Sequence, residues 1–394
     1  MVNPKKIFKQ NQAQTFPSPS CLVVKSAKGN YIIDIKNKKY LDFVAGVSAC
    51  SLGHSNPIII NEIKSQIDKY THVMVYGEYI QEPQYKLAQM LAEVLPENLN
   101  CTYFTNSGTE AIEGAMKLAK RITKNSEIIS FKGSYHGSTQ GSLSIMGNEN
   151  QKSNYRPLIP DCKQLIFNEN KSLLEITSKT AAVVVEPIQG ATGFIKPKEK
   201  YIEKLRKRCD ETNTLLIFDE IQTCFGRLGE FFALNYFNVI PDILCIAKGM
   251  GGGMPIGAFI SSNKNMNFLT HNPPLGHITT FGGHPVNCAA SLAVLKYLKN
   301  SNIMKKIKNK EAIFRRELVH EKISKINGFG LMLAIVLKNE KHSKILVEEA
   351  LNKGLILFYF LNAKDSVRVT PPLTISEEEI VKGCLIIRNI LDDI

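Results

Sequence analysis

Continuous apolar runs alternate with amphipathic stretches through the middle of the chain. Residues 181–187 (AAVVVEP), 214–220 (TLLIFDE) and 241–249 (PDILCIAKG) are short runs rich in aliphatic residues, which is typical of buried strands. Between the first two runs, residues 199–213 place apolar side chains at helical spacing among charged ones. Buried strands joined by such a helix predict a parallel sheet that is covered on both faces.

A charged side chain stands where each of the three runs ends. Glu186 and Asp219 close the first and second runs, and Lys248 closes the third. Ligands of open parallel sheets bind at the carboxyl ends of the strands, so three charged groups at one rim predict a site. Taken singly, each residue also fits a structural role, either as a paired carboxylate or as a lysine that reaches solvent.

The pattern changes toward the C-terminus. A long helical region begins at residues 291–300, and residues 330–340 and 354–360 each read as a strand. Residues 366–380 read as a strand, a proline turn and a capped helix. This mixture predicts a smaller α+β unit after the parallel sheet.

These patterns give an expected division of the chain. We expect a large domain over residues 51–294 and a smaller C-terminal domain over residues 295–394. Residues 29–43 alternate apolar and polar side chains, which predicts a hairpin. Residues 1–50 are therefore expected to join the smaller domain.

Composition narrows the function classes. The chain has 394 residues, 44% of them hydrophobic, which suffices for a large core. Its net charge of +13 is spread along the chain without interleaved aromatics, so we expect no nucleic-acid partner. We find no secretion signal and no apolar run near the roughly 18 residues of a membrane helix. Nine cysteines without a CxxC pair favour reduced thiols in a cytoplasmic protein, and we assign no metal ligands.

A candidate anion site lies within residues 103–121 (YFTNSGTEAIEGAMKLAKR). Ser107, Gly108 and Thr109 stand where a strand gives way to a helix. Free backbone N–H groups and the helix dipole at such a start attract anions, and phosphate is the usual guest. The same residues also fit a plain N-cap.

A second candidate segment is the glycine–serine loop over residues 132–142. It contains Tyr135 and His136, and an aromatic ring in this loop could stack on a planar cofactor or pack on the core. Glycines at positions 249 and 251–253 follow Lys248 and allow a close backbone approach.

Together these features match the needs of pyridoxal 5'-phosphate, which are a phosphate cradle, an aromatic plate, a carboxylate and a lysine. The lysine must lose its proton to react with the cofactor aldehyde, and partial burial lowers its pKa. The carboxylate must face the pyridine nitrogen to keep it protonated, because the charged ring is the electron sink. The sequence therefore predicts this cofactor.

The chain resembles the class III aminotransferases of fold type I, in the acetylornithine and ornithine aminotransferase group. The resemblance spans nearly the whole chain in eight ordered motifs: YLDFVAGVSACSLGHSNP, FTNSGTEAIEGAMKLAK, YHG, VVVEPIQG, LLIFDEIQTCFGRLG, PDILCIAKGMGGGMPIGA, HITTFGGHPVNCAASLAVL and VRVTPPLTI. It implies the α/β fold of the PLP-dependent transferases, with a large domain on a mostly parallel central sheet and a smaller α+β domain.

The resemblance also implies roles for residues that bind the cofactor. Lys248 would bind it covalently, Asp219 would pair with the pyridine nitrogen, and Gln222 would contact the phenolic oxygen. Residues 107–109 would hold the phosphate, and Tyr135 would stack on the ring.

Further roles follow from the same resemblance. Thr280 would reach the phosphate of the other subunit, which implies a homodimer with shared active sites. Arg368 matches an arginine that can bind a substrate carboxylate, although it also fits a structural ion pair. We count His136 and Glu186 among the cofactor-binding residues and expect Arg227 to be structural.

Three positions depart from the family pattern and bear on the substrate. The family usually has an arginine where this chain has Ser138, and a glutamate where it has Ala191. That glutamate pairs with the second arginine, so without it Arg368 is free to bind a carboxylate from every substrate. Ornithine enzymes favour a tyrosine at the position of Val47, which we include among the substrate-binding residues.

The expected function is a two-stage transamination from an amino donor to a 2-oxo acid, with 2-oxoglutarate as the expected acceptor. The donor would be acetylornithine, ornithine or another ω-amino compound, and freed Lys248 would move the proton. The alternatives are an aminomutase of the glutamate-1-semialdehyde type, a decarboxylase, or a diamine transaminase on the same fold. A cofactor-binding protein without turnover is the alternative from another class.

Overall fold

The apolar runs form the middle of a seven-stranded sheet in the order β4-β10-β9-β8-β7-β5-β6. The structure is a computed structural model that describes residues 3–394. The strands are β4 (Cys101–Thr105), β5 (Glu127–Phe131), β6 (Cys162–Leu165), β7 (Thr180–Val185), β8 (Leu215–Asp219), β9 (Ile243–Ile246) and β10 (Gly257–Ser261). Only β10 runs against its neighbours, so the sheet is mostly parallel, as predicted.

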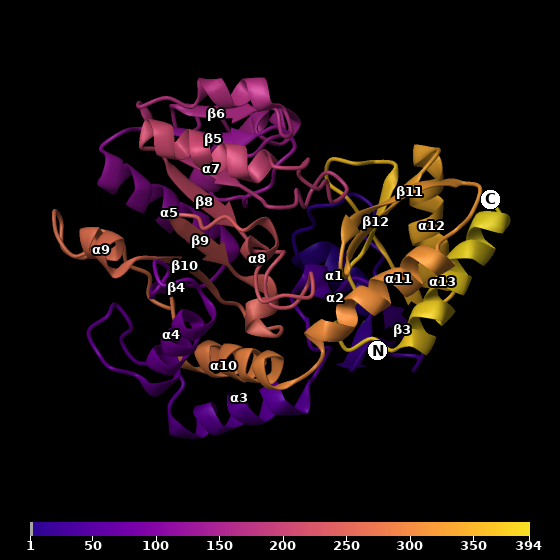
Figure 1. Cartoon of the computed structure of the whole chain (residues 1–394). Helices are drawn as coiled ribbons and strands as arrows, with labels where there is room; N and C mark the ends of the chain where they lie inside the picture. The colour runs from indigo at the N-terminus through magenta and orange to yellow at the C-terminus, as the bar shows by residue number, and fades with distance from the viewer. Residues whose placement is uncertain (1–2) are drawn as a thin grey trace.

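Helices cover both faces of this sheet (Figure 1). Helix α5 (Gly108–Thr123) and helix α7 (Tyr201–Thr212) belong to two different core clusters. Alternate residues of β7 divide between these clusters: Val183 and Val185 belong to the cluster that contains α7, whereas Ala182 and Val184 belong to the cluster that contains α5. Because successive side chains of a strand point to opposite faces, a strand buried on both sides needs an unbroken apolar run.

A group of longer helices packs beside the sheet. Helix α10 (Pro285–Asn300) contacts both α3 (Pro57–Lys69) and α4 (Glu82–Val94), and all three lie together at one side of the molecule in Figure 1. Residue 294 lies inside α10, so the expected boundary crosses a continuous helix. The division of the chain at residues 50 and 294 stays a prediction.

The C-terminal part contains a four-stranded antiparallel sheet in the order β11-β12-β15-β14. Its elements are α11 (Ile307–Glu317), β11 (Ile323–Phe329), β12 (Met332–Leu337), α12 (Glu340–Asn352), β14 (Phe358–Tyr359), β15 (Ser366–Val369) and α13 (Glu377–Asp392). Helix α13 begins with a capping box between Ser376 and Glu379. The strand expected within residues 330–340 and the strand, proline turn and capped helix expected over residues 366–380 are therefore present, whereas β11, α11 and α12 were not predicted.

One expectation for this part was wrong. Residues 354–360 form two short strands, β13 (Leu355–Ile356) and β14, in place of one. β13 pairs in parallel with β3 (Lys39–Asp42), whereas β14 pairs with β15. The run changes sheets at Leu357, and such a change leaves no mark in the local apolar pattern.

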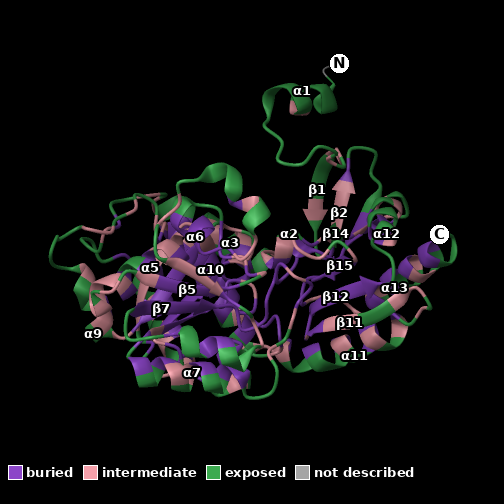
Figure 2. Cartoon of the chain, turned by 90° about the horizontal axis from the view of Figure 1, so that it is seen from above, coloured by how far each residue is buried: buried purple, intermediate pink, exposed green. Residues whose placement is uncertain are grey.

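The N-terminal segment pairs with β13. Strands β1 (Val24–Lys28), β2 (Tyr31–Asp34) and β3 form a meander that includes the predicted hairpin. Helix α1 (Pro4–Asn11) contains no buried residue and lies away from the rest of the chain (Figure 2). The remaining short α-helices are α2 (Ala45–Ser48), α6 (Gln140–Ser144), α8 (Leu234–Phe237) and α9 (Asn263–Met266).

Six 3₁₀ turns complete the elements of the described residues, 3–394. They span Glu149–Gln151, Ser153–Tyr155, Asn170–Glu175, Lys248–Gly251, Asn267–Leu269 and Met304–Lys306. Within residues 3–394, no helix is both long and apolar enough to cross a membrane. All nine cysteines are free in the structure.

Candidate active site

The carboxyl ends of β7, β8 and β9 lie side by side, because these strands are neighbours in the sheet. Glu186 follows β7, Asp219 ends β8, and Lys248 lies two residues after β9. The loop after β5 brings His136 to the same rim, where its Nδ1 lies 2.7 Å from Asp219 Oδ2. Sequence spacing and sheet topology therefore bring the expected charged residues together.

Lys248 lies in an unusual environment for a lysine. Burial lowers the pKa of its ammonium, and the nearby positive charge of Arg368 lowers it further, while Asp219 and Glu186 act in the opposite direction. The backbone of Lys248 is left-handed, with φ at 46°, and it opens a 3₁₀ turn. Such strain in a residue with a side chain is typical of functional sites.

The carboxylate of Glu186 organises the backbone around the rim. Its Oε1 accepts a hydrogen bond from Tyr135 N at 3.0 Å, and its Oε2 accepts one from Gly190 N at 2.7 Å. Burial raises the pKa of Glu186, and the neighbouring His136 opposes that shift. Glu186 thereby fixes the position of Tyr135 at the backbone.

The start of α5 provides the free N–H groups that an anion needs. Ser107 is the N-cap, and its Oγ accepts a hydrogen bond from Glu110 N at 3.3 Å. In the part of the chain that the structure describes, the N–H groups of Gly108 and Thr109 have no acceptor. Thr109 Oγ1 lies 2.7 Å from both Thr139 Oγ1 and Ser142 Oγ. The N-cap reading thus holds for Ser107, and it leaves the two following N–H groups open.

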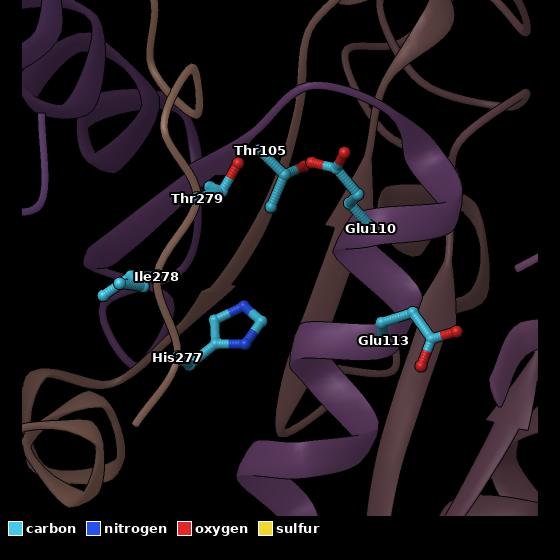
Figure 3. A pocket seen from close by; sticks show the side chains of 6 residues that line it. All are labelled: Thr105, Glu110, Glu113, His277, Ile278 and Thr279. Atoms are coloured by element: carbon cyan, nitrogen blue, oxygen red, sulfur yellow. The ribbon is translucent and has the colours of Figure 1, made fainter. Parts of the chain in front are cut away.

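A pocket of about 250 Å³ lies beside this helix start (Figure 3). Helix α5 supplies Glu110 and Glu113, and the segment before α10 supplies residues 277–279. Both carboxylates are engaged: Glu110 accepts from Asn106 N, and Glu113 accepts from backbone N–H groups at the start of α6. The sequence analysis did not single out these residues.

Arg368 projects from the middle of β15 and is only 6% exposed. Its Cζ lies over the rings of Phe194 and Phe360, and burial lowers its pKa to about 10. It forms no ion pair with any residue from 3 to 394. Its positive charge contributes to the lowered pKa of the Lys248 ammonium, and the carboxylate of Glu186 opposes the lowering of the pKa of Arg368 itself.

Arg227 is fully buried and plays a different part. Its Nη1 donates hydrogen bonds to the backbone oxygens of Leu331 and Pro371, at 3.0 and 2.6 Å. These contacts tie the loop after β8 to the C-terminal sheet, in keeping with the structural role that we expected.

The sequence profile described as "Aminotransferase class-III" matches residues 13–391 of the chain. The chain belongs to this family.

Relatives of the chain are named for different amino donors. The acetylornithine aminotransferase of Clostridium acetobutylicum is 38% identical over 369 residues, which cover 90% of this chain and 92% of that protein. The putrescine aminotransferase of Pectobacterium atrosepticum is 35% identical over 368 residues, which cover 89% of this chain and 78% of that protein. The crystal structure of the ornithine aminotransferase from Toxoplasma gondii ME49 superposes with a TM-score of 0.91 and 28% identity, covering 100% of this chain and 96% of that one.

These similarities confirm the predicted α/β fold of type I and the predicted enzyme class, an aminotransferase of the acetylornithine aminotransferase-like group. The roles of single residues in this class III chain stay predictions.

The remaining candidate residues of this aminotransferase lie at two places. Gln222 lies beside the rim, where its Nε2 donates to Ser48 Oγ at 3.2 Å. Thr280 is exposed in the loop before α10. The preceding Thr279 contacts Asn106 Nδ2 at 2.9 Å.

Val47 and Ser48 belong to a left-handed helical turn. All four residues of α2 have positive φ, at 52° for Ala45, 59° for Gly46, 59° for Val47 and 69° for Ser48. Such a turn is disfavoured by about 1–2 kcal/mol for each residue that carries a side chain. The surrounding structure must therefore hold it in place.

An ion pair that the sequence analysis missed supports this turn. Asp42 Oδ1 accepts hydrogen bonds from Val44 N and Ala45 N, at 2.7 and 3.0 Å. Asp42 Oδ2 lies 2.8 Å from His54 Nε2, and this contact raises the pKa of His54 to about 10. The motif LDFVAGVSACSLGH contains both Asp42 and His54. Their pairing depends on the left-handed turn between them, and the single glycine in that turn, Gly46, does not predict it from the sequence.

Proposed function

We propose that the chain binds pyridoxal 5'-phosphate at this rim and transfers an amino group from an amino donor to a 2-oxo acid, with 2-oxoglutarate as the acceptor. The donor is acetylornithine, ornithine or another ω-amino compound. The observation that supports this most is the convergence of Lys248, the Asp219–His136 pair and the open N–H groups of α5 at one rim.

The residues present fit this cofactor. The free N–H groups of Gly108 and Thr109 suit its phosphate, and the helix dipole of α5 adds positive potential there. Asp219 Oδ1 is fixed by Ile221 N at 3.0 Å and Oδ2 by His136, so the carboxylate is oriented to hold a proton on a ring nitrogen. When bound, the cofactor supplies an electron sink for the carbanion that proton removal leaves on the substrate.

Lys248 is the group that moves the proton. Its lowered pKa increases the fraction of neutral amine at Nζ, which can then take a proton from the substrate carbon. The protonated Nζ returns the proton at the next step. Tyr135 is held by Glu186 at its backbone, so its ring is available to cover one side of the site.

The test of this function is a half-reaction with single amino donors. Purified holoenzyme is mixed with glutamate, acetylornithine, ornithine, lysine or putrescine, and the absorbance of the cofactor is followed from its aldehyde form to its amine form. We expect at least one donor to convert the cofactor fully, and 2-oxoglutarate to restore the spectrum. An aminomutase would turn over without an external acceptor, and a spectrum that no donor changes would refute the proposal.

Arg368→Ala tests how the substrate is held. We expect KM for substrates with a carboxylate to rise about 10- to 100-fold, because a bidentate arginine–carboxylate contact contributes about 1.5–3 kcal/mol. KM for plain amines should change little. Arg388→Ala is a matched control, because Arg388 pairs with Glu317 away from the rim. Equal changes for both kinds of substrate would show that Arg368 is structural.

We further propose a cytoplasmic homodimer whose subunits share their active sites. Thr280 supports this, because it is exposed beside two exposed apolar side chains, Ile278 and Phe281. These are 47% and 53% exposed, which suits a contact surface.

A further inference from the structure

Arg368 is a buried cation without an anionic partner. It is 6% exposed, and its Nε is buried without any hydrogen-bond acceptor among residues 3–394. Buried arginines are normally paired, because an uncompensated buried charge is strongly destabilising. Something other than a carboxylate must therefore hold this guanidinium.

Two aromatic rings take that place. The Cζ atom of Arg368 lies 4.8 Å from the ring centroid of Phe360 and 5.3 Å from that of Phe194. The two ring centroids are 4.7 Å apart and the ring planes meet at 82°. The rings thus form a corner, which we call the aromatic corner, and a cation over two ring faces is stabilised electrostatically.

The aromatic corner is built from two distant loops that are held together. Phe194 lies in the loop after β7, with a left-handed φ of 55°, and its ring is fully buried. This loop is closed by a bridge between Gln189 and Ile195. Asn362 N, two residues after Phe360, donates to Ala191 O at 3.0 Å and links the two loops. Both rings are therefore fixed before any ligand arrives.

We propose that Phe194 and Phe360 are positioning residues that hold Arg368 open for a substrate carboxylate. The inference rests on the proposed function only in taking the ligand to be a carboxylate. A carboxylate partner at Arg368 would have to be displaced by each substrate, whereas ring faces hold the cation without occupying its N–H donors. The aromatic corner thus replaces an acidic partner and removes the competition with substrate.

The experiment compares Phe194→Leu, Phe360→Leu and the double variant with the wild type. We expect each single variant to raise KM for 2-oxoglutarate about fivefold, because each loses one cation–π contact to Arg368. The kcat should be nearly unchanged. KM for a carboxylate-free aldehyde acceptor should not move. Phe360→Tyr keeps a ring face and should restore the KM for 2-oxoglutarate.

Binding is measured separately by calorimetric titration of the holoenzyme with glutarate, and Kd should rise by the same factor. Phe314→Leu is the matched control, since Phe314 is fully buried and packs edge-on against Phe43, away from Arg368. It should lower Tm without changing KM or Kd. Phe360→Tyr guards against variants that fail to fold.

Two outcomes are distinguishable. Leucine variants that fold and keep the wild-type KM and Kd would overturn the role of the aromatic corner while leaving the proposed transamination intact. A wild-type enzyme that binds no glutarate and transfers no amino group would overturn the proposed function itself.

Discussion

Lys248→Ala is expected to abolish transamination, with turnover falling on the order of 10⁵-fold or more. In the proposed mechanism both the covalent contact and the proton transfer depend on Nζ of Lys248, so no neighbouring residue would replace it. The fold should survive, because burial disfavours the charge of this lysine and its removal takes away an unfavourable group. Single-turnover absorbance with a fixed donor measures the loss, and Tm measures the fold.

A second measurement locates the covalent bond. Borohydride trapping followed by peptide mass spectrometry should find the vitamin B6 derivative on Lys248 in the wild type and on no lysine in the variant. Lys310→Met is the matched control: Lys310 is also buried with a lowered pKa, but its Nζ donates to Leu373 O, away from the rim. Turnover in Lys248→Ala close to that of the wild type would refute the mechanism.

Asp219→Asn should lower kcat on the order of a thousandfold, which corresponds to about 4 kcal/mol of transition-state stabilisation. An amide keeps the shape of the side chain and loses the charge that would hold a proton on the ring nitrogen. It also weakens the contact with His136, so the ring of His136 is held less firmly. The measurement is kcat at saturating donor and acceptor, together with the absorbance of the bound cofactor.

Asp242→Asn separates this effect from a general loss of stability. Asp242 is a carboxylate just before β9, at the amino end of the strand and therefore opposite the rim. It accepts hydrogen bonds from Leu216 N and Arg206 Nη1, both at 2.7 Å. Its variant should lose stability and keep kcat. If Asp219→Asn and Asp242→Asn lowered kcat equally, the role of Asp219 would be to stabilise the fold and not to take part in the reaction.

The central sheet could be predicted from sequence because its signal is local. Strands β7 and β8 are apolar except for Thr180 at the start of β7 and Asp219 at the end of β8, and that pattern follows directly from burial on both faces. The break between β13 and β14 could not be predicted, because it is set by β3 and β15, whose residues are far away in the chain.

The candidate site divides in the same way. Glu186, Asp219 and Lys248 could be found because parallel strands bring their carboxyl ends to one edge. The aromatic corner and the Asp42–His54 pair could not, since each joins segments whose contact depends on the complete fold. From the sequence alone, Phe194 is indistinguishable from an ordinary core residue. Its proposed second role, holding the guanidinium of Arg368, follows only from the position of Arg368 in the fold.

The left-handed turn at α2 limits how this enzyme can diversify. Val47 precedes Ser48, whose Oγ accepts a hydrogen bond from Gln222, and we predict that it contacts the substrate. A change of its side chain is then expected to alter the range of accepted amines. Its backbone already adopts a conformation that β-branched residues disfavour. A substitution at position 47 that changes substrate preference would therefore also change thermal stability. An enzyme that acquired it would need compensating substitutions around Asp42 and His54.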